Sequence, residues 1–155
     1  MNFAIKINEY DINNLFFNEQ NKNNVDTNFI RFIYSSDLYS LNGISFIFEI
    51  KNLKYEKYFN NKYKYFFNIH ENNEIIQFIK NMEFNIISQF SSHSFHTNKY
   101  SQLKLSEQFN RGELKFFKND MNGTIYSFFI LKISGIWSSN DSYGLTYKIL
   151  PINHP

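Results

Sequence analysis

The sequence contains no cysteine, so it cannot form a disulfide framework, an iron–sulfur cluster or a zinc site with thiolate ligands. A secretory signal is not expected either, because Lys6, Glu9 and Asp11 interrupt the N-terminal residues before an apolar run forms. The longest apolar stretch, residues 125–137, contains Lys132 and is shorter than the roughly 20 residues that span a membrane. These absences predict an intracellular protein, of the cytoplasm or nucleus, that is neither secreted nor associated with a membrane.

Catalytic motifs are also missing. The sequence has no G-x-S-x-G nucleophile motif, no Gly-rich phosphate loop and no H-E-x-x-H zinc motif. His93 and His96 have no nearby carboxylate or cysteine to complete a metal site, so we interpret them as part of a solvated loop. Glu71 and Glu74 stand at the start of an expected helix, where capping accounts for them. We therefore predict a protein that is not an enzyme and that has no cofactor and no metal.

Alanine and arginine are rare, since Ala4 is the single alanine and Arg31 and Arg111 are the two arginines, whereas asparagine occurs 24 times. Asparagine, lysine, isoleucine, phenylalanine and tyrosine are enriched together when the coding DNA is rich in A and T. The composition therefore predicts an AT-rich source such as a virus, a plasmid or a parasite. The net charge of +2 is too small to indicate nucleic-acid binding by itself. Evidence for such binding has to come from where the charges lie along the sequence.

A chain of 155 residues fits one domain, and we expect a single domain over residues 1–155. Residues 73–90 are expected to form its one long helix, ended by Ser91 and Ser92. Apolar side chains recur there at steps of three and four residues, at Ile75, Ile79, Met82, Ile86 and Phe90. Strands are expected over residues 3–7, 28–34, 114–117, 124–137 and 144–150, a loop over 8–28, irregular structure over 91–113, a turn at Asn122-Gly123 and a tail over 151–155.

Two hairpins are expected between the loop and the helix. In the first, Asn42-Gly43 joins residues 38–41 to residues 44–50, because Asn-Gly is the strongest short hairpin signal. The alternation in ISFIFEI places four side chains on one face, namely Ile44, Phe46, Phe48 and Ile50. In the second, Asn60-Asn61 joins residues 53–59 to residues 62–69, since asparagine tolerates the left-handed region of a turn.

The order of strands, one helix and further strands predicts a mainly β protein with one long helix. An OB-fold barrel has a similar order, and its faces bind oligonucleotides or sugars. We therefore expect an OB-like β-barrel, closed or partly open.

The segment KNLKYEKYFNNKYKYFF, residues 51–67, has five lysines against Glu56, a net charge of +4 in 17 residues. With the turn at Asn60-Asn61, Lys57 is expected to face Lys64 across the hairpin. Like charges in this position are mildly destabilising, and a phosphate chain would relieve the repulsion. The interleaved aromatic side chains would stack on bases. The structural alternative is that tyrosine and phenylalanine are good strand formers and that lysine protects an exposed edge.

This segment supplies the candidate nucleic-acid-binding residues. Only one of the two faces of the hairpin can line a binding groove. The phosphate contacts are expected from Lys54, Lys57, Lys62 and Lys64, and the stacking from Tyr55, Tyr58, Tyr63 and Tyr65. Arg31 and Lys132 are weaker candidates on neighbouring strands. The single tryptophan, Trp137, is interpreted first as a plug of the barrel core and second as a base-stacking residue.

The C-terminal pattern Leu131-Lys-Ile-Ser-Gly-Ile-Trp137, a polar turn and Tyr143-Gly-Leu-Thr-Tyr-Lys-Ile149 resembles the closing hairpin of a known family. The family is the small OB-fold single-stranded-DNA-binding proteins of large eukaryotic DNA viruses and related AT-rich replicons. The resemblance implies a non-catalytic protein that coats displaced strands during viral or plasmid replication. Some proteins of this kind end in an acidic tail that recruits replication partners, whereas this sequence ends in Pro151-Ile-Asn-His-Pro155.

Our leading hypothesis is therefore sequence-tolerant binding of single-stranded DNA, with RNA as an open alternative ligand. A homo-oligomer and replication proteins are further partners to consider. The second hypothesis is a structural or assembly protein, such as a virion component, whose aromatic hairpin contacts other proteins. The third is an enzyme of an unrecognised type, which a deep pocket lined by His93, His96 and acids would indicate.

Overall fold

The computed structural model describes residues 3–18, 29–58, 62–93, 99–115 and 126–153. Its elements in chain order are β1 (Ile5–Lys6), the short 3₁₀ helices η1 (Ile7–Glu9) and η2 (Ile12–Asn14), β2 (Leu15–Asn18), β3 (Phe29–Ser35), β4 (Ser40–Asn42), β5 (Ile44–Glu49), β6 (Lys54–Tyr58), β7 (Lys62–Phe66), α1 (Asn73–His93), β8 (Tyr100–Gln102), α2 (Lys104–Asn110), β9 (Glu113–Leu114), β10 (Phe128–Ser138) and β11 (Ser142–Ile152). The expectation of a mainly β protein with one long helix is confirmed.

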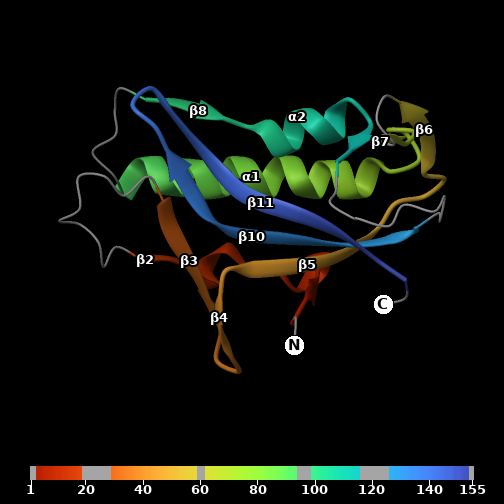
Figure 1. Cartoon of the computed structure of the whole chain (residues 1–155). Helices are drawn as coiled ribbons and strands as arrows, with labels where there is room; N and C mark the ends of the chain where they lie inside the picture. The colour runs from red at the N-terminus through yellow and green to blue at the C-terminus, as the bar shows by residue number, and fades with distance from the viewer. Residues whose placement is uncertain (1–2, 19–28, 59–61, 94–98, 116–125, 154–155) are drawn as a thin grey trace.

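The strands form two sheets. The large sheet has the order β1-β5-β10-β11-β8, and β3, which also pairs with β2 and β4, joins it through β10. The small sheet has the order β6-β7-β9. Neither sheet closes into a barrel within the part of the chain that the structure describes. Figure 1 shows α1 lying across one side of the large sheet, with α2 next to it.

Strand β10 is the centre of the large sheet. It pairs antiparallel with β11 along its whole length and, on its other edge, first with β5 and then with β3. The change of partner coincides with an irregularity between Ile133 and Gly135. A bulge of this kind bends a strand and increases its twist. The irregularity thus lies where β10 passes from β5 to β3, which both pair with it antiparallel.

The predicted helix is confirmed, and it is longer than expected. The apolar stripe of α1 is buried, with exposed fractions of 6% or less at Ile75, Ile79, Met82, Ile86 and Phe90. The expected end at Ser91 and Ser92 is wrong, because α1 continues to His93. The Ser91 and Ser92 hydroxyls donate to the carbonyl oxygens of Ser88 and Gln89, which accommodates serine inside the last turn.

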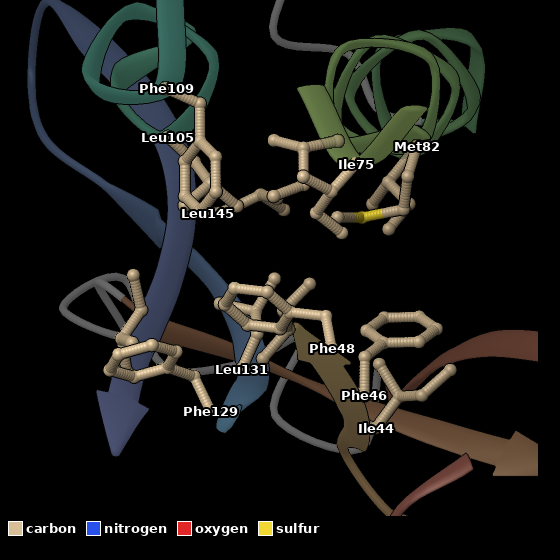
Figure 2. Close-up of a cluster of buried hydrophobic side chains, with 14 of the residues drawn as sticks. Ile44, Phe46, Phe48, Ile75, Met82, Leu105, Phe109, Phe129, Leu131 and Leu145 are labelled. Atoms are coloured by element: carbon tan, nitrogen blue, oxygen red, sulfur yellow. The ribbon is translucent and has the colours of Figure 1, made fainter. Parts of the chain in front are cut away.

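One continuous cluster of buried side chains lies between the sheets and the helices. Figure 2 shows part of it, with side chains of β5 and β10 facing those of α1 and α2. The predicted face of β5 is confirmed, since Ile44, Phe46, Phe48 and Ile50 are all buried. The ring centroids of Phe46 and Phe78 on α1 are 5.2 Å apart, so this inner face of the sheet packs on α1. Alternate residues of each strand therefore form an outer face that points away from α1.

The Asn42-Gly43 hairpin prediction is wrong. Strand β4 pairs with β3, whereas β5 pairs with β1 and β10, so Gly43 lies at a corner between strands that do not pair with each other. Its φ is +77°, and a Cβ there would lie 2.7 Å from the carbonyl oxygen of Ile133. The Gly43 N–H donates to the carbonyl oxygen of Phe32 at 2.8 Å. Glycine is therefore needed for the close approach of β10 as well as for its φ.

Several segments expected to be irregular are regular. Residues 15–18 of the expected loop form β2, which pairs with β3. Residues 91–113 contain β8 and α2, and Pro151 and Ile152 of the expected tail belong to β11. The expected N-terminal strand is reduced to Ile5–Lys6, and the segment expected as the strand 114–117 contributes Leu114 to β9, which pairs with β7. The expected turn at Asn122-Gly123 lies outside the described residues.

Candidate nucleic-acid interface

The lysine-rich segment does form a hairpin, but its register differs from the prediction by one residue. Strands β6 and β7 pair with Glu56 opposite Lys64 and Lys57 opposite Tyr63. The expected Lys57–Lys64 pair is therefore wrong. Strand β6 ends at Tyr58 and β7 begins at Lys62, which leaves three residues between them instead of two. One extra residue moves every later side chain to the other face of a hairpin.

The observed register divides the predicted site between two faces. Lys57 shares its face with Tyr55, Tyr63 and Tyr65, because these residues are directly paired or alternate along the strands. Lys54 and Lys64 share the opposite face with Glu56. Tyr58 and Lys62 form the last pair of the hairpin. Lys57 is thus on the other face of the hairpin from Lys54 and Lys64.

The tyrosines of this hairpin pack on one another. The Tyr55 ring centroid lies 5.6 Å from that of Tyr63 and 5.9 Å from that of Tyr65. Tyr65 is 5% exposed, and burial, followed by the proximity of Tyr63 and Tyr55, raises the pKa of its hydroxyl. Tyr55, at 36%, is the most exposed of the three. The hairpin therefore offers less open ring surface than its sequence suggests.

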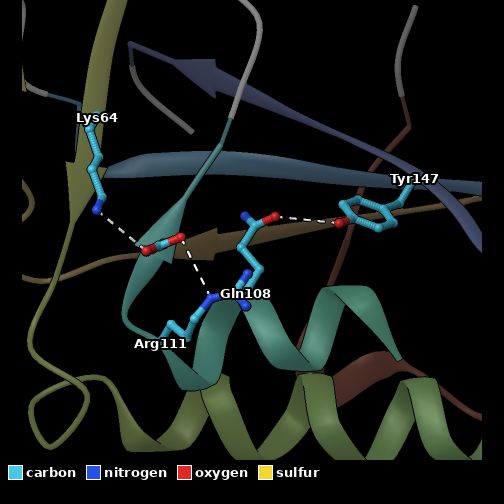
Figure 3. A network of polar contacts seen from close by, with 5 residues as sticks. Lys64, Gln108, Arg111 and Tyr147 are labelled. Carbon is cyan, nitrogen blue, oxygen red and sulfur yellow. Dashed lines mark hydrogen bonds and ion pairs between the residues drawn. The ribbon is translucent and has the colours of Figure 1, made fainter. Parts of the chain in front are cut away.

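Lys64 has a carboxylate partner. Its Nζ lies 3.5 Å from Glu113, and the Arg111 Nε lies 3.7 Å from the other oxygen of the same carboxylate (Figure 3). Figure 3 also shows the hydrogen bond that the Tyr147 hydroxyl donates to Gln108 at 3.3 Å. Glu113 therefore offsets part of the positive charge that Lys64 would offer to a phosphate.

A second set of cations lies on the outer face of the large sheet. Lys132 on β10 is directly opposite Lys148 on β11, and both are exposed. Their neighbours Leu131, Ile133 and Ile149 are buried on the inner face, which places the two lysines on the outer face. Neither lysine makes an ion pair with any residue of the described ranges. The predicted candidate Lys132 therefore belongs to a pair that sequence reasoning missed.

Trp137 is on the same outer face, and its interpretation as a core plug is wrong. It is half-buried, stands outside the buried cluster, and lies beside Gly144 of β11. A Cβ on Gly144 would lie 3.1 Å from the indole Nε1, so the indole lies across this glycine. The Lys104 Nζ, at the start of α2, is 5.1 Å from the indole centroid. This distance fits a cation–π contact.

A second ring and cation lie next to Trp137. Phe29 on β3 is directly opposite Trp137, and the Arg31 guanidinium carbon is 5.8 Å from the Phe29 ring centroid. The predicted candidate Arg31 is exposed. Together these residues make up what we call the cationic face, namely Phe29, Arg31, Lys104, Lys132, Trp137 and Lys148. The described outer positions of β3, β5, β10 and β11 include one acidic residue, Glu49, which lies opposite Phe128.

Other functional signals are few in the described residues. They contain no group of three or more histidine, cysteine or carboxylate side chains that could hold a metal ion. Of the two histidines predicted to lie in a loop, His93 is the last residue of α1, which corrects that prediction, and His96 lies outside the described residues. Over the same residues, none of the helices has the length and apolar character needed to cross a membrane.

Comparisons with known proteins found no relative of this chain. No family model matches it, and searches of curated proteins and of solved structures found no match either. A function therefore has to be inferred from the geometry of the described residues.

Proposed function

We propose that this protein binds single-stranded nucleic acid without catalysis, and that the cationic face is the binding surface. The observation that carries the proposal is the Lys132–Lys148 pair, in which two exposed lysines are directly opposite each other without a carboxylate partner among the described residues. Such a pair costs stability in the free protein. A bound phosphate chain would turn this repulsion into attraction and would release counterions.

The aromatic residues favour a single strand as the ligand. Bases of a single strand are free to stack on side-chain rings, and one stacked base contributes about 1–3 kcal/mol. Trp137 and Phe29 are paired across β10 and β3, and each has a cation close to its ring. Ring and cation together suit a base and its phosphate, whereas the bases of a duplex are stacked inside the helix.

The β10–β11 hairpin provides Lys132, Trp137 and Lys148, and its sequence is the segment that resembles viral single-stranded-DNA-binding proteins. We extend the proposal accordingly to an OB-like architecture, an intracellular location and a role in viral or plasmid replication. The lysines of the β6–β7 hairpin would contribute to the positive potential that attracts the ligand.

Fluorescence anisotropy of labelled oligo-dT at low and moderate salt, with duplex DNA and oligo-rU as competitors, tests the proposal. We expect tight binding that weakens with salt and that duplex DNA does not displace. Lys132→Ala with Lys148→Ala should reduce the slope of log affinity against log salt by about 0.7 for each phosphate that is no longer bound. Lys80→Ala with Lys115→Ala, which removes two exposed lysines outside the cationic face, is the matched control. Absence of binding at low salt would overturn the proposal.

A second candidate function, assembly, is favoured by a different part of the outer face. Ile47, Ile130 and Leu150 are half-buried neighbours in one row across β5, β10 and β11. Such a row can pack against another protein surface. Sedimentation analysis of the wild type and of Ile130→Lys tests this function. An oligomer that Ile130→Lys dissociates, with no affinity for oligonucleotides, would favour assembly over nucleic-acid binding.

A further inference from the structure

Helix α2 begins without a capping side chain of its own. Its N-cap residue is Leu103, which cannot accept a hydrogen bond from the first turn. The missing acceptor comes from α1 instead. The Glu83 carboxylate accepts from the backbone N–H groups of Leu105 at 3.2 Å and of Ser106 at 3.1 Å. Glu83 has an exposed fraction of 0%, so its carboxylate is committed to this contact inside the protein.

The first residue of this anchored turn is Lys104, whose ammonium lies 5.1 Å from the Trp137 ring centroid. Helix α2 has only seven residues, and helices of this length do not hold their shape by themselves. The position of Lys104 therefore depends on what fixes the start of α2. We infer that Glu83 is a positioning residue that holds Lys104 over Trp137 on the cationic face.

The inference rests on the proposed function, and it adds a buried carboxylate on α1 to the residues on which binding depends. The neighbouring strand contributes to the same geometry, because β8 pairs with β11 and brings Gln102 next to Gly144. That pairing fixes the chain two residues before Lys104. Glu83 fixes it one and two residues after Lys104, so the lysine is held from both sides.

Binding measurements on single and double variants test the coupling. Lys104→Ala should weaken oligo-dT binding several-fold and reduce the salt slope by about 0.7, the value of one phosphate contact on a single strand. Glu83→Gln keeps the side-chain shape but replaces one acceptor oxygen by an amide donor, and it should have a similar effect. In the double variant the two effects should not add, because both act through Lys104. Glu107→Gln, an exposed carboxylate on α2, is the matched control.

A spectroscopic measurement tests the position of Lys104 without a nucleic acid. Trp137 is the single tryptophan of the chain, so the intrinsic fluorescence excited at long wavelength comes from it alone. A nearby ammonium attracts iodide, and quenching by iodide relative to neutral acrylamide should therefore fall in Lys104→Met. The same fall is expected in Glu83→Gln, and Glu83→Asp, which keeps the charge, should recover part of it. Loss of folding would instead raise quenching by acrylamide, so the two effects are separable.

The outcomes distinguish the inference from the proposed function. If Lys104→Ala weakens binding and the folded Glu83→Gln variant binds and is quenched like the wild type, the positioning role is wrong and the proposed function stands. If the wild type does not bind oligo-dT at all, the proposed function fails, and the iodide measurement still decides whether Glu83 positions Lys104.

Discussion

Lys132 of β10 and Lys148 of β11 are directly opposite each other on the outer face of the large sheet. The described outer positions of β3, β5, β10 and β11 include one acidic residue, Glu49. It lies four residues along β5 from Ser45, which is the neighbour of Lys132. The pair is thus a local concentration of positive charge at the middle of the sheet, where strand pairing fixes both backbones. A site of this kind favours binding of an anion over stability of the free protein.

Lys132→Ala should therefore change stability and binding in opposite directions. Removal of one lysine relieves a cross-strand repulsion, which is expected to raise the free energy of unfolding by about 0.2–1 kcal/mol. Affinity for oligo-dT should fall. Urea unfolding and anisotropy on the same samples measure the two effects. A decrease in both stability and affinity would contradict the repulsion argument.

The buried carboxylate of Glu83 should make stability depend on pH. Burial raises its pKa above the ordinary value of 4.5, and the N–H of Ser106 and then of Leu105 offset part of this effect, while Glu107 adds to it. The native state then binds the proton more tightly than the unfolded chain. The resulting stabilisation is complete below pH 4.5 and is lost as the pH rises through the raised pKa.

Glu83→Gln removes this titration. The variant loses part of the cap of α2, which costs about 1 kcal/mol at any pH. Its free energy of unfolding, relative to that of the wild type, should therefore increase as the pH rises from 4.5 to 7. Urea unfolding across this range measures the difference, with Glu74→Gln, which removes an exposed carboxylate of α1, as the control. A difference in unfolding free energy between variant and wild type that stays constant with pH would contradict the prediction.

Gly43→Ala should destabilise the corner between β4 and β5. The new Cβ would lie 2.7 Å from the carbonyl oxygen of Ile133, at a φ of +77° that costs a residue with a side chain about 1–2 kcal/mol. We expect a decrease in stability of about 2 kcal/mol or more, since β10 would also have to move. Thermal unfolding compares this variant with Ser45→Ala on the outer face of β5. Equal melting temperatures for the two would show that the corner tolerates a side chain.

Charge removal on the cationic face should affect binding more than charge removal on the lysine-rich hairpin. Lys132 and Lys148 are on one face, whereas Lys54 and Lys57 are on opposite faces of β6. We expect the double alanine variant of the first pair to lose more oligo-dT affinity than that of the second pair. Both variants remove two charges, so long-range attraction changes equally. A larger decrease for the hairpin variant would return the site to β6 and β7.

Periodicity in the sequence predicted the elements whose apolar faces are continuous. The stripe of α1 and the alternation of β5 both identify buried side chains correctly, because burial of one face is what fixes these elements. Helix α2 was missed, since its seven residues bury only Leu105 and Phe109 as an apolar pair among polar neighbours. Their spacing of four residues is a helical signal that is too short to separate from chance.

The candidate site was harder to predict than the fold, because it depends on which strands become neighbours. Asn42-Gly43 has the strongest local turn signal, yet β1 and β10 occupy the two edges of β5, and β4 pairs with β3 instead. Lys132 and Lys148 come together through the register of β10 and β11, and Lys104 reaches Trp137 through the capping of α2. Local propensity does not contain these long-range pairings.

The central place of β10 has a consequence for how the chain is made. Strands β1, β3 and β5 all come from the first 50 residues, and two of them pair directly with residues 128–138. During synthesis on the ribosome, the edge of β5 that pairs with β10 therefore has no permanent neighbour until residues 128–138 emerge. Contacts between such distant segments form slowly, and uncovered strand edges invite pairing with other chains. We expect nascent chains shorter than this to need protection by a chaperone, and folding to complete in one late step when β10 enters the sheet.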